Sequence, residues 1–67
     1  MNAPGLSPLH TKSLELSGGL AKLLIVVGDA YQLADEHSAA QQLLSEMWNG
    51  IWEAYKASGS LLTELKR

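Results

Sequence analysis

The sequence predicts an all-α fold, an antiparallel two-helix hairpin that dimerises into a four-helix bundle. Apolar residues recur at spacings of four and three along two segments of similar length, with a very short polar segment between them. No segment shows the period-two alternation of a strand flanked by turn signals. A chain of 67 residues without cysteine makes one small domain and has no disulfide or thiolate zinc site to stabilise it. The chain must therefore be stabilised by regular helix packing or by association with another chain.

The first helix is predicted over about 8–35, after a flexible N-terminal arm at 1–7. Ser7 followed by Pro8 is typical of a helix start, because serine caps the helix and proline is tolerated at its first position. The glycine pair at 18–19 costs about 2 kcal/mol of helix propensity relative to alanine. The sequence therefore leaves open whether this helix is continuous, bends at the pair or begins only near it.

The turn is predicted at 35–38, where Asp35-Glu36-His37 interrupts the apolar pattern. Ser38 stands three residues before Gln41, the spacing of a capping box, and so begins a second helix over about 39–66. A connection this short makes the two helices adjacent and antiparallel, and residues 8–67 form the hairpin.

Each helix carries more apolar surface than the other helix can cover. One stripe consists of Leu16, Leu20, Leu23, Val27, Ala30 and Ala34, and of Ala40, Leu44, Met47, Ile51, Ala54, Ser58, Leu61 and Leu65. An offset stripe consists of Trp48, Trp52, Tyr55, Gly59 and Leu62, with Leu24 and Tyr31. If one stripe faces the other helix, the second lies in water and predicts an association surface. The residues predicted for the dimer or partner interface are Leu20, Leu24, Val27, Tyr31, Met47, Trp48, Ile51, Trp52, Tyr55 and Leu62.

The distribution of charge predicts how two hairpins pair. Between Leu23 and Tyr55 there are five acidic residues and no Lys or Arg, whereas the remainder has five basic residues and two acidic ones. The half near the turn therefore carries −5 and the open half +3, which together give the net charge of −2. Two hairpins packed head to tail would bring opposite charges together, so we expect an antiparallel homodimer.

Trp48, Trp52 and Tyr55 share one face of the second helix because they are four and three residues apart. Anchors at these spacings are typical of a helix that binds in a groove of another protein. Aromatic residues at helical spacing also pack within cores, and dimer core is the favoured interpretation of the two.

No catalytic, cofactor-binding or metal-binding residue is predicted, and the chain is not expected to be an enzyme. The serines stand in no nucleophile motif, and the glycine pair at 18–19 does not match a phosphate-binding loop. Adjacent ligands on a turn, as in Asp35-Glu36-His37, do not converge on a metal ion. In a head-to-tail dimer His10 could approach His37 of the second copy, but an exposed turn histidine is the preferred interpretation.

The function that this sequence predicts is that of a small, cytoplasmic, non-enzymatic dimer. It would regulate, inhibit or act as an adaptor for a larger partner protein, without a membrane and without nucleic acid. The longest uninterrupted apolar run, 23–27, is five residues and far too short to span a membrane. A further alternative is a helical subunit that needs a different protein to complete its core.

The inferred architecture resembles the plasmid repressor-of-primer family, dimers of short helical hairpins that bind paired RNA loops. The resemblance is one of shape and length, without a shared residue motif. It implies the alternative function of a bundle-type RNA-binding regulator. Five basic residues against seven acidic ones make a poor RNA-binding surface.

Overall fold

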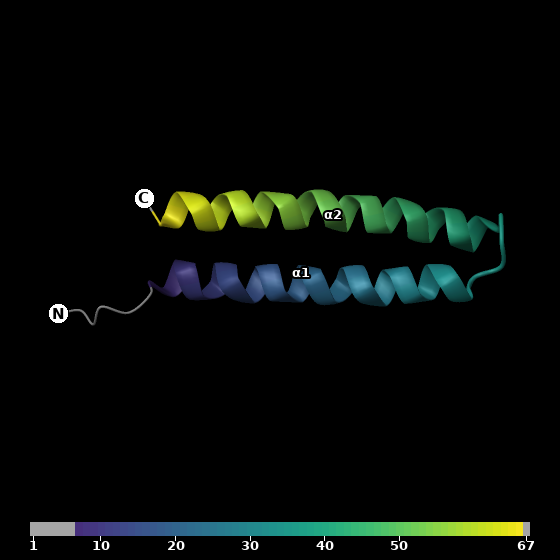
Figure 1. Ribbon diagram of the computed structural model, residues 1–67, viewed down its shortest axis with the longest axis horizontal. Helices are drawn as coiled ribbons and strands as arrows, with labels where there is room; N and C mark the ends of the chain where they lie inside the picture. The colour runs from purple at the N-terminus through teal and green to yellow at the C-terminus, as the bar shows by residue number, and fades with distance from the viewer. Residues whose placement is uncertain (1–6, 67) are drawn as a thin grey trace.

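The computed structural model describes residues 7–66 as two long helices that lie side by side (Figure 1). Helix α1 spans Pro8–Leu33 and α2 spans Ala39–Leu65, and the described residues contain no strand. The predicted all-α helical hairpin is confirmed. Apart from Ser7, the predicted arm at 1–7 lies outside the described residues.

Serine side chains cap the start of both helices. The hydroxyl oxygen of Ser7 accepts a hydrogen bond from the backbone N–H of His10 at 3.1 Å, and Pro8 occupies the first helical position. The Ser38 hydroxyl oxygen accepts from the backbone N–H of Gln41, also at 3.1 Å. These bonds satisfy N–H groups that a helix cannot pair internally, so both helix starts form where the sequence predicts them.

Helix α1 ends at Leu33, two residues before the predicted boundary. The following residue, Ala34, has an extended backbone with ψ of 152°, although its N–H still donates to the carbonyl of Ala30. His37 then reverses the chain with a φ of 62°, in the left-handed region. The side-chain oxygen of Gln41 accepts from the N–H of His37 at 3.0 Å and closes the turn.

The glycine pair at 18–19 does not interrupt α1, which is helical through both residues. Both glycines are exposed, and a Cβ atom built on either would have no other atom within 4 Å. Helix α1 therefore remains continuous despite the low helix propensity of the pair, because the residues on either side pack against α2 and stabilise it.

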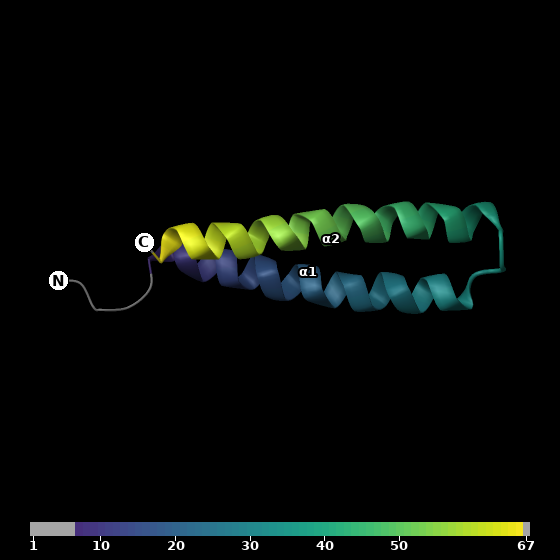
Figure 2. The same cartoon turned by 45° about the horizontal axis from the view of Figure 1, so that its top comes forward.

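A seam of the least exposed side chains joins the two helices. In α1 these are Ser13, Ser17, Leu20, Leu24 and Val27, with Tyr31 at the seam's edge and Ala34 just beyond the end of the helix. In α2 they are Gln41, Leu44, Trp48, Ile51, Tyr55, Ser58, Leu62 and Leu65. Both sets keep the alternating spacing of three and four that a helix pair requires. The helices cross at a shallow angle, since α2 overlaps α1 near the chain termini in Figure 2 and lies apart from it near the turn.

The interior of the hairpin is small and partly polar. Among the described residues, Val27 is the one buried hydrophobic side chain. The other buried side chains are those of Ser13 and Ser58. The Ser13 hydroxyl donates to the carbonyl of Leu9 at 2.8 Å, and that of Ser58 donates to the carbonyl of Tyr55 at 2.7 Å. These bonds satisfy the buried hydroxyls, so small side chains let the helices approach near the open end without an unpaired polar group.

Candidate functional site

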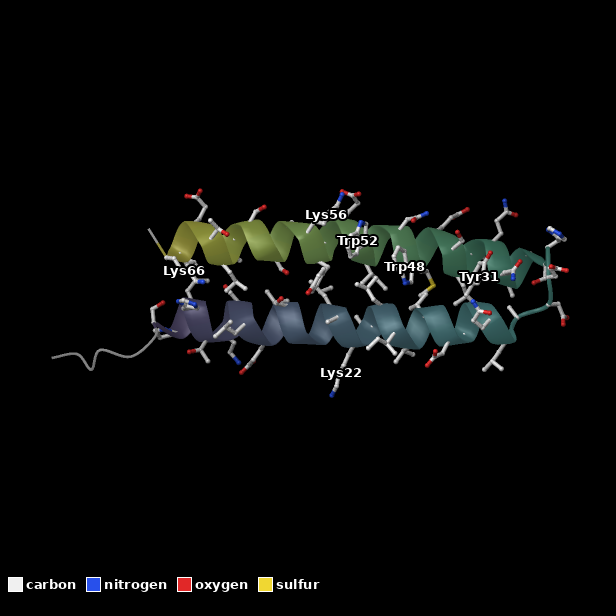
Figure 3. All side chains as sticks on the ribbon, viewed as in Figure 1. Lys22, Tyr31, Trp48, Trp52, Lys56 and Lys66 are labelled. Atoms are coloured by element: carbon white, nitrogen blue, oxygen red, sulfur yellow. The ribbon has the colours of Figure 1, made fainter. Side chains whose placement is uncertain are left out.

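Trp48 connects the two helices at the centre of the seam. Its indole N–H donates a hydrogen bond to the carbonyl oxygen of Leu24 in α1 at 3.2 Å. A Cβ atom built on Gly28 would lie 3.8 Å from the indole nitrogen, so the indole packs directly beside that glycine. Figure 3 shows Trp48 projecting from α2 toward α1. Trp48 thus contributes to the packing of α2 against α1 within one hairpin.

The three aromatic residues of α2 form a continuous stack. The ring centroids of Trp48 and Trp52 are 5.7 Å apart, and those of Trp52 and Tyr55 are 5.9 Å apart. Trp48 and Tyr55 are half-buried in the seam, whereas Trp52 is 38% exposed at its rim. The stack therefore holds Trp52 in place while leaving part of its ring open to a binding partner.

The residues predicted for the interface divide between the seam and the surface. The half-buried or buried members, which lie in the seam, are Leu20, Leu24, Val27, Trp48, Ile51, Tyr55 and Leu62. Tyr31, Met47 and Trp52 are exposed. Because the seam uses members of both predicted stripes, Leu16 and Leu23 of the first stripe lie outward, 56% and 48% exposed. Burial of a large aromatic ring gains more free energy than burial of alanine or methionine. Helix α2 is therefore oriented so that Trp48 and Tyr55 of the second stripe face α1.

A second set of apolar residues points away from the seam on one side of the hairpin. In both helices these residues again alternate in spacings of three and four, except between Leu9 and Leu16, where Lys12 occupies the intervening position. We define the apolar face as Leu9, Leu16, Gly19, Leu23, Val26, Ala30 and Leu33 of α1 together with Ala40, Leu43, Met47, Gly50, Ala54, Ala57 and Leu61 of α2. Seven of the eleven exposed large hydrophobic side chains of the described chain lie on it. Such a surface is the usual mark of an association site.

The two halves of the apolar face lie on the same side of the hairpin. In each helix the face begins one residue before a seam residue, as Leu23 precedes Leu24 and Met47 precedes Trp48. The helices are right-handed and run in opposite directions, so these preceding positions turn toward the same side. The halves join into one surface across both helices.

Charged residues border the apolar face without interrupting its centre. Lys12 and Glu64 continue the spacing of three and four at the open end of the hairpin. Lys12 pairs there with Glu15 at 3.3 Å. Along the outer edge of α1 lie Lys22 and Asp29, and along that of α2 lie Glu46 and Glu53. Figure 3 shows Lys22 pointing away from α2. Glu53 pairs with Lys56 at 3.0 Å, and both side chains are exposed.

The opposite side of the hairpin, which carries Trp52, is more polar and is shallowly grooved. A groove of about 210 Å³ is lined by Gly28, Tyr31, Gln32, Ser45, Trp48 and Asn49. A neighbouring groove of about 290 Å³ near the turn is lined by Tyr31, His37, Ser38, Gln41, Gln42 and Ser45. Amides and hydroxyls alternate with aromatic rings in these grooves, whereas Leu14 and Ile25, which are 46% and 65% exposed, lie on this side nearer the open end.

The described residues hold no group of three or more His, Asp or Glu side chains that could bind a metal ion. His10 lies in the first turn of α1 and His37 lies beyond its end, so one hairpin keeps them far apart. Neither α1 nor α2 is long and apolar enough to cross a membrane.

No protein-family model matches this sequence, and comparison with curated proteins and with solved structures finds no significant similarity.

Proposed function

We propose that this chain is a non-enzymatic helical module that associates through its apolar face. It acts by protein–protein contacts, as a regulator, adaptor or inhibitor of a larger partner protein. The observation that supports this function is the continuous apolar face itself, in which both helices present exposed leucine, valine and methionine side chains on one side. Side chains in this arrangement gain free energy when another protein removes them from water.

The dimensions of the apolar face suit a stable protein interface. From residue 9 to residue 33 the face runs for about 36 Å along α1, at about 1.5 Å per residue. Two adjacent helices are about 20 Å wide, so the footprint is roughly 700 Å². Stable interfaces bury about 800 Å² on each partner, and this face supplies most of such an area.

Self-association is the simplest way to cover the apolar face. A second copy brings an identical face with the same heptad spacing, so four helices enclose a core that neither hairpin has alone. The resulting homodimer leaves Trp52 and the grooves beside Tyr31 on the outside. We assign contact with the larger partner protein to that outer side.

The oligomeric state of two charge-matched variants tests this proposal. Leu23→Glu adds a negative charge at the centre of the apolar face, and Gln32→Glu adds the same charge on the opposite side. In sedimentation velocity at tens of micromolar, we expect a dimer for the natural sequence and for Gln32→Glu. We expect a monomer for Leu23→Glu. A monomeric natural sequence, or a dimer for all three, contradicts the proposal.

No observation in the described residues favours the RNA-binding alternative. Lys22 and Lys56 extend from opposite edges of the hairpin in Figure 3, and Lys66 lies at the open end. RNA binding needs basic side chains gathered on one face, and these lie apart.

A further inference from the structure

We infer that the apolar face receives a second copy of this chain head to tail, with α2 packed against α2 of the second copy across a two-fold axis near Gly50. The inference rests on the proposed function, which makes the apolar face an association surface. It adds the orientation and the register of the two copies. In such an interface, when one residue contacts another in the second copy, the reverse contact occurs as well.

The order of large and small side chains along α2 supports this register. When the apolar face of α2 is paired with itself about Gly50, each large side chain lies level with a small one. The pairs are Leu43 with Ala57, Met47 with Ala54, and Leu61 with Ala40. Alternation of large and small residues across facing helices fills the space between them. Gly50 itself lies at the axis, where a Cβ atom would have no other atom of the hairpin within 4 Å.

The same axis also centres the apolar face of α1. This part of the face spans residues 9–33 with its midpoint at residue 21, and the α2 part spans 40–61 with its midpoint beside Gly50. The hydrogen bond from Trp48 to Leu24 shows that those two residues lie at similar levels in the hairpin. The helices are antiparallel, so three residues back from Leu24 and three residues on from Trp48 cover the same distance, at about 1.5 Å per residue. Residue 21 is therefore level with about residue 51. One axis brings both halves of the face into full overlap.

The charges of the two halves favour this orientation over its alternative. Head to tail, the half that carries −5 lies over the half that carries +3, whereas turns at the same end would bring the two −5 halves together. At the border of α1, Asp29 of one copy comes level with Lys12 of the other. Like charges also meet at the borders, because Glu46 comes within a turn of Glu53 of the second copy, and Lys22 comes within a turn of Lys22 of the second copy.

Disulfide cross-linking tests the register directly, because the natural sequence has no cysteine. Facing Cα atoms of two packed helices lie roughly 4–6 Å apart, within the range of a disulfide. With glutathione disulfide as the oxidant, we expect Gly50→Cys to become a covalent dimer as its main product. An equimolar mixture of Met47→Cys and Ala54→Cys links in the same way. Leu43→Cys is the matched control on the same face, since its two copies lie roughly 20 Å apart.

Each outcome of this experiment has a defined meaning. Links at Gly50 and between Met47 and Ala54, without a Leu43 link, support the head-to-tail register. A link in a mixture of Leu23→Cys and Gly50→Cys, with none in Gly50→Cys alone, shows that the turns lie at the same end and overturns the inference. A dimer in sedimentation that forms none of these links overturns the inference and leaves the proposed function standing. A monomer in sedimentation overturns both. Circular dichroism of each variant verifies that it is helical.

Discussion

The indole N–H of Trp48 donates to the carbonyl oxygen of Leu24, which links residues 24 positions apart across the hairpin at 3.2 Å. Eight further side-chain hydrogen bonds join residues three or four positions apart within the chain. The bond from Trp48 to Leu24 is thus a polar contact between the helices, and it favours one position of α1 along α2.

Trp48→Phe removes this interhelical hydrogen bond while keeping an aromatic ring in the seam. We expect the free energy of unfolding to fall by about 1–2 kcal/mol, because a partly buried hydrogen bond and some apolar contact are lost. Trp52→Phe is the matched control, since Trp52 lies at the rim and 38% of it is exposed. Thermal unfolding followed by circular dichroism measures both variants. Equal losses would show that the hydrogen bond adds nothing beyond the ring.

Ser38→Ala removes the N-cap of α2. The Ser38 hydroxyl oxygen accepts from the N–H of Gln41 at 3.1 Å, and that N–H has no partner within the helix. We expect a loss of about 1 kcal/mol in the free energy of unfolding. Ser60→Ala, at an exposed position toward the C-terminal end of α2, serves as the control and is expected to be neutral or slightly stabilising. Urea denaturation of both variants gives the comparison.

His37→Gly tests the left-handed backbone of the turn. A φ of 62° is unfavourable for a residue with a Cβ atom and costs glycine nothing. Relief of that strain outweighs the greater freedom that glycine has in the unfolded chain, so we expect a gain of up to about 1 kcal/mol. A lower melting temperature for His37→Gly would show that the histidine side chain stabilises the turn by more than its strain.

Gly18→Ala tests the cost of the glycine pair in α1. Residue 18 is exposed, lies off the apolar face and has nothing within 4 Å of a built Cβ atom. We expect a gain of about 1 kcal/mol from helix propensity alone, with no change in oligomeric state. Gly50→Leu is the informative contrast, because a large side chain at the inferred axis is expected to push the two copies apart. A dimer that accepts Gly50→Leu as readily as Gly18→Leu contradicts the register.

Glu46→Gln addresses an unfavourable border contact of the head-to-tail arrangement. In that arrangement Glu46 approaches Glu53 of the second copy, so removing its charge is expected to strengthen the dimer severalfold, as about 0.5–1 kcal/mol implies. The measurement is the dimer dissociation constant at low and high salt. With the turns at the same end, Glu46 and Glu53 border Lys22 of the second copy, and both Glu46→Gln and Glu53→Gln would weaken the dimer.

Most of the hairpin could be predicted from local signals in the sequence. The two caps, Ser7 and Ser38, act over three residues and form as expected. The residues that face the seam were harder to assign, because α1 is apolar around most of its circumference. Leu23 and Leu24 are both leucines, and only packing against Trp48 decides which of them turns inward. The sequence does not predict that the Ser13 hydroxyl is buried, because a serine that donates to its own helix has no distinctive sequence signal.

The sequence does not separate the apolar face from the seam, because its first stripe contains residues of both. In α2, Ala40, Met47 and Ala54 of that stripe lie on the apolar face, whereas Leu44, Ile51 and Ser58 lie in the seam. Their spacing becomes meaningful once the positions of Trp48 and Tyr55 in the seam are known.

Val27 is the one hydrophobic side chain among the described residues that the hairpin buries on its own. So small an interior removes little apolar surface from water, which leaves little free energy to offset the entropy lost on ordering two long helices. Whatever covers the apolar face therefore acts as a ligand of the folded form and raises its melting temperature by mass action. In the proposed dimer, dilution therefore lowers the melting temperature, because it removes the copy that covers the apolar face.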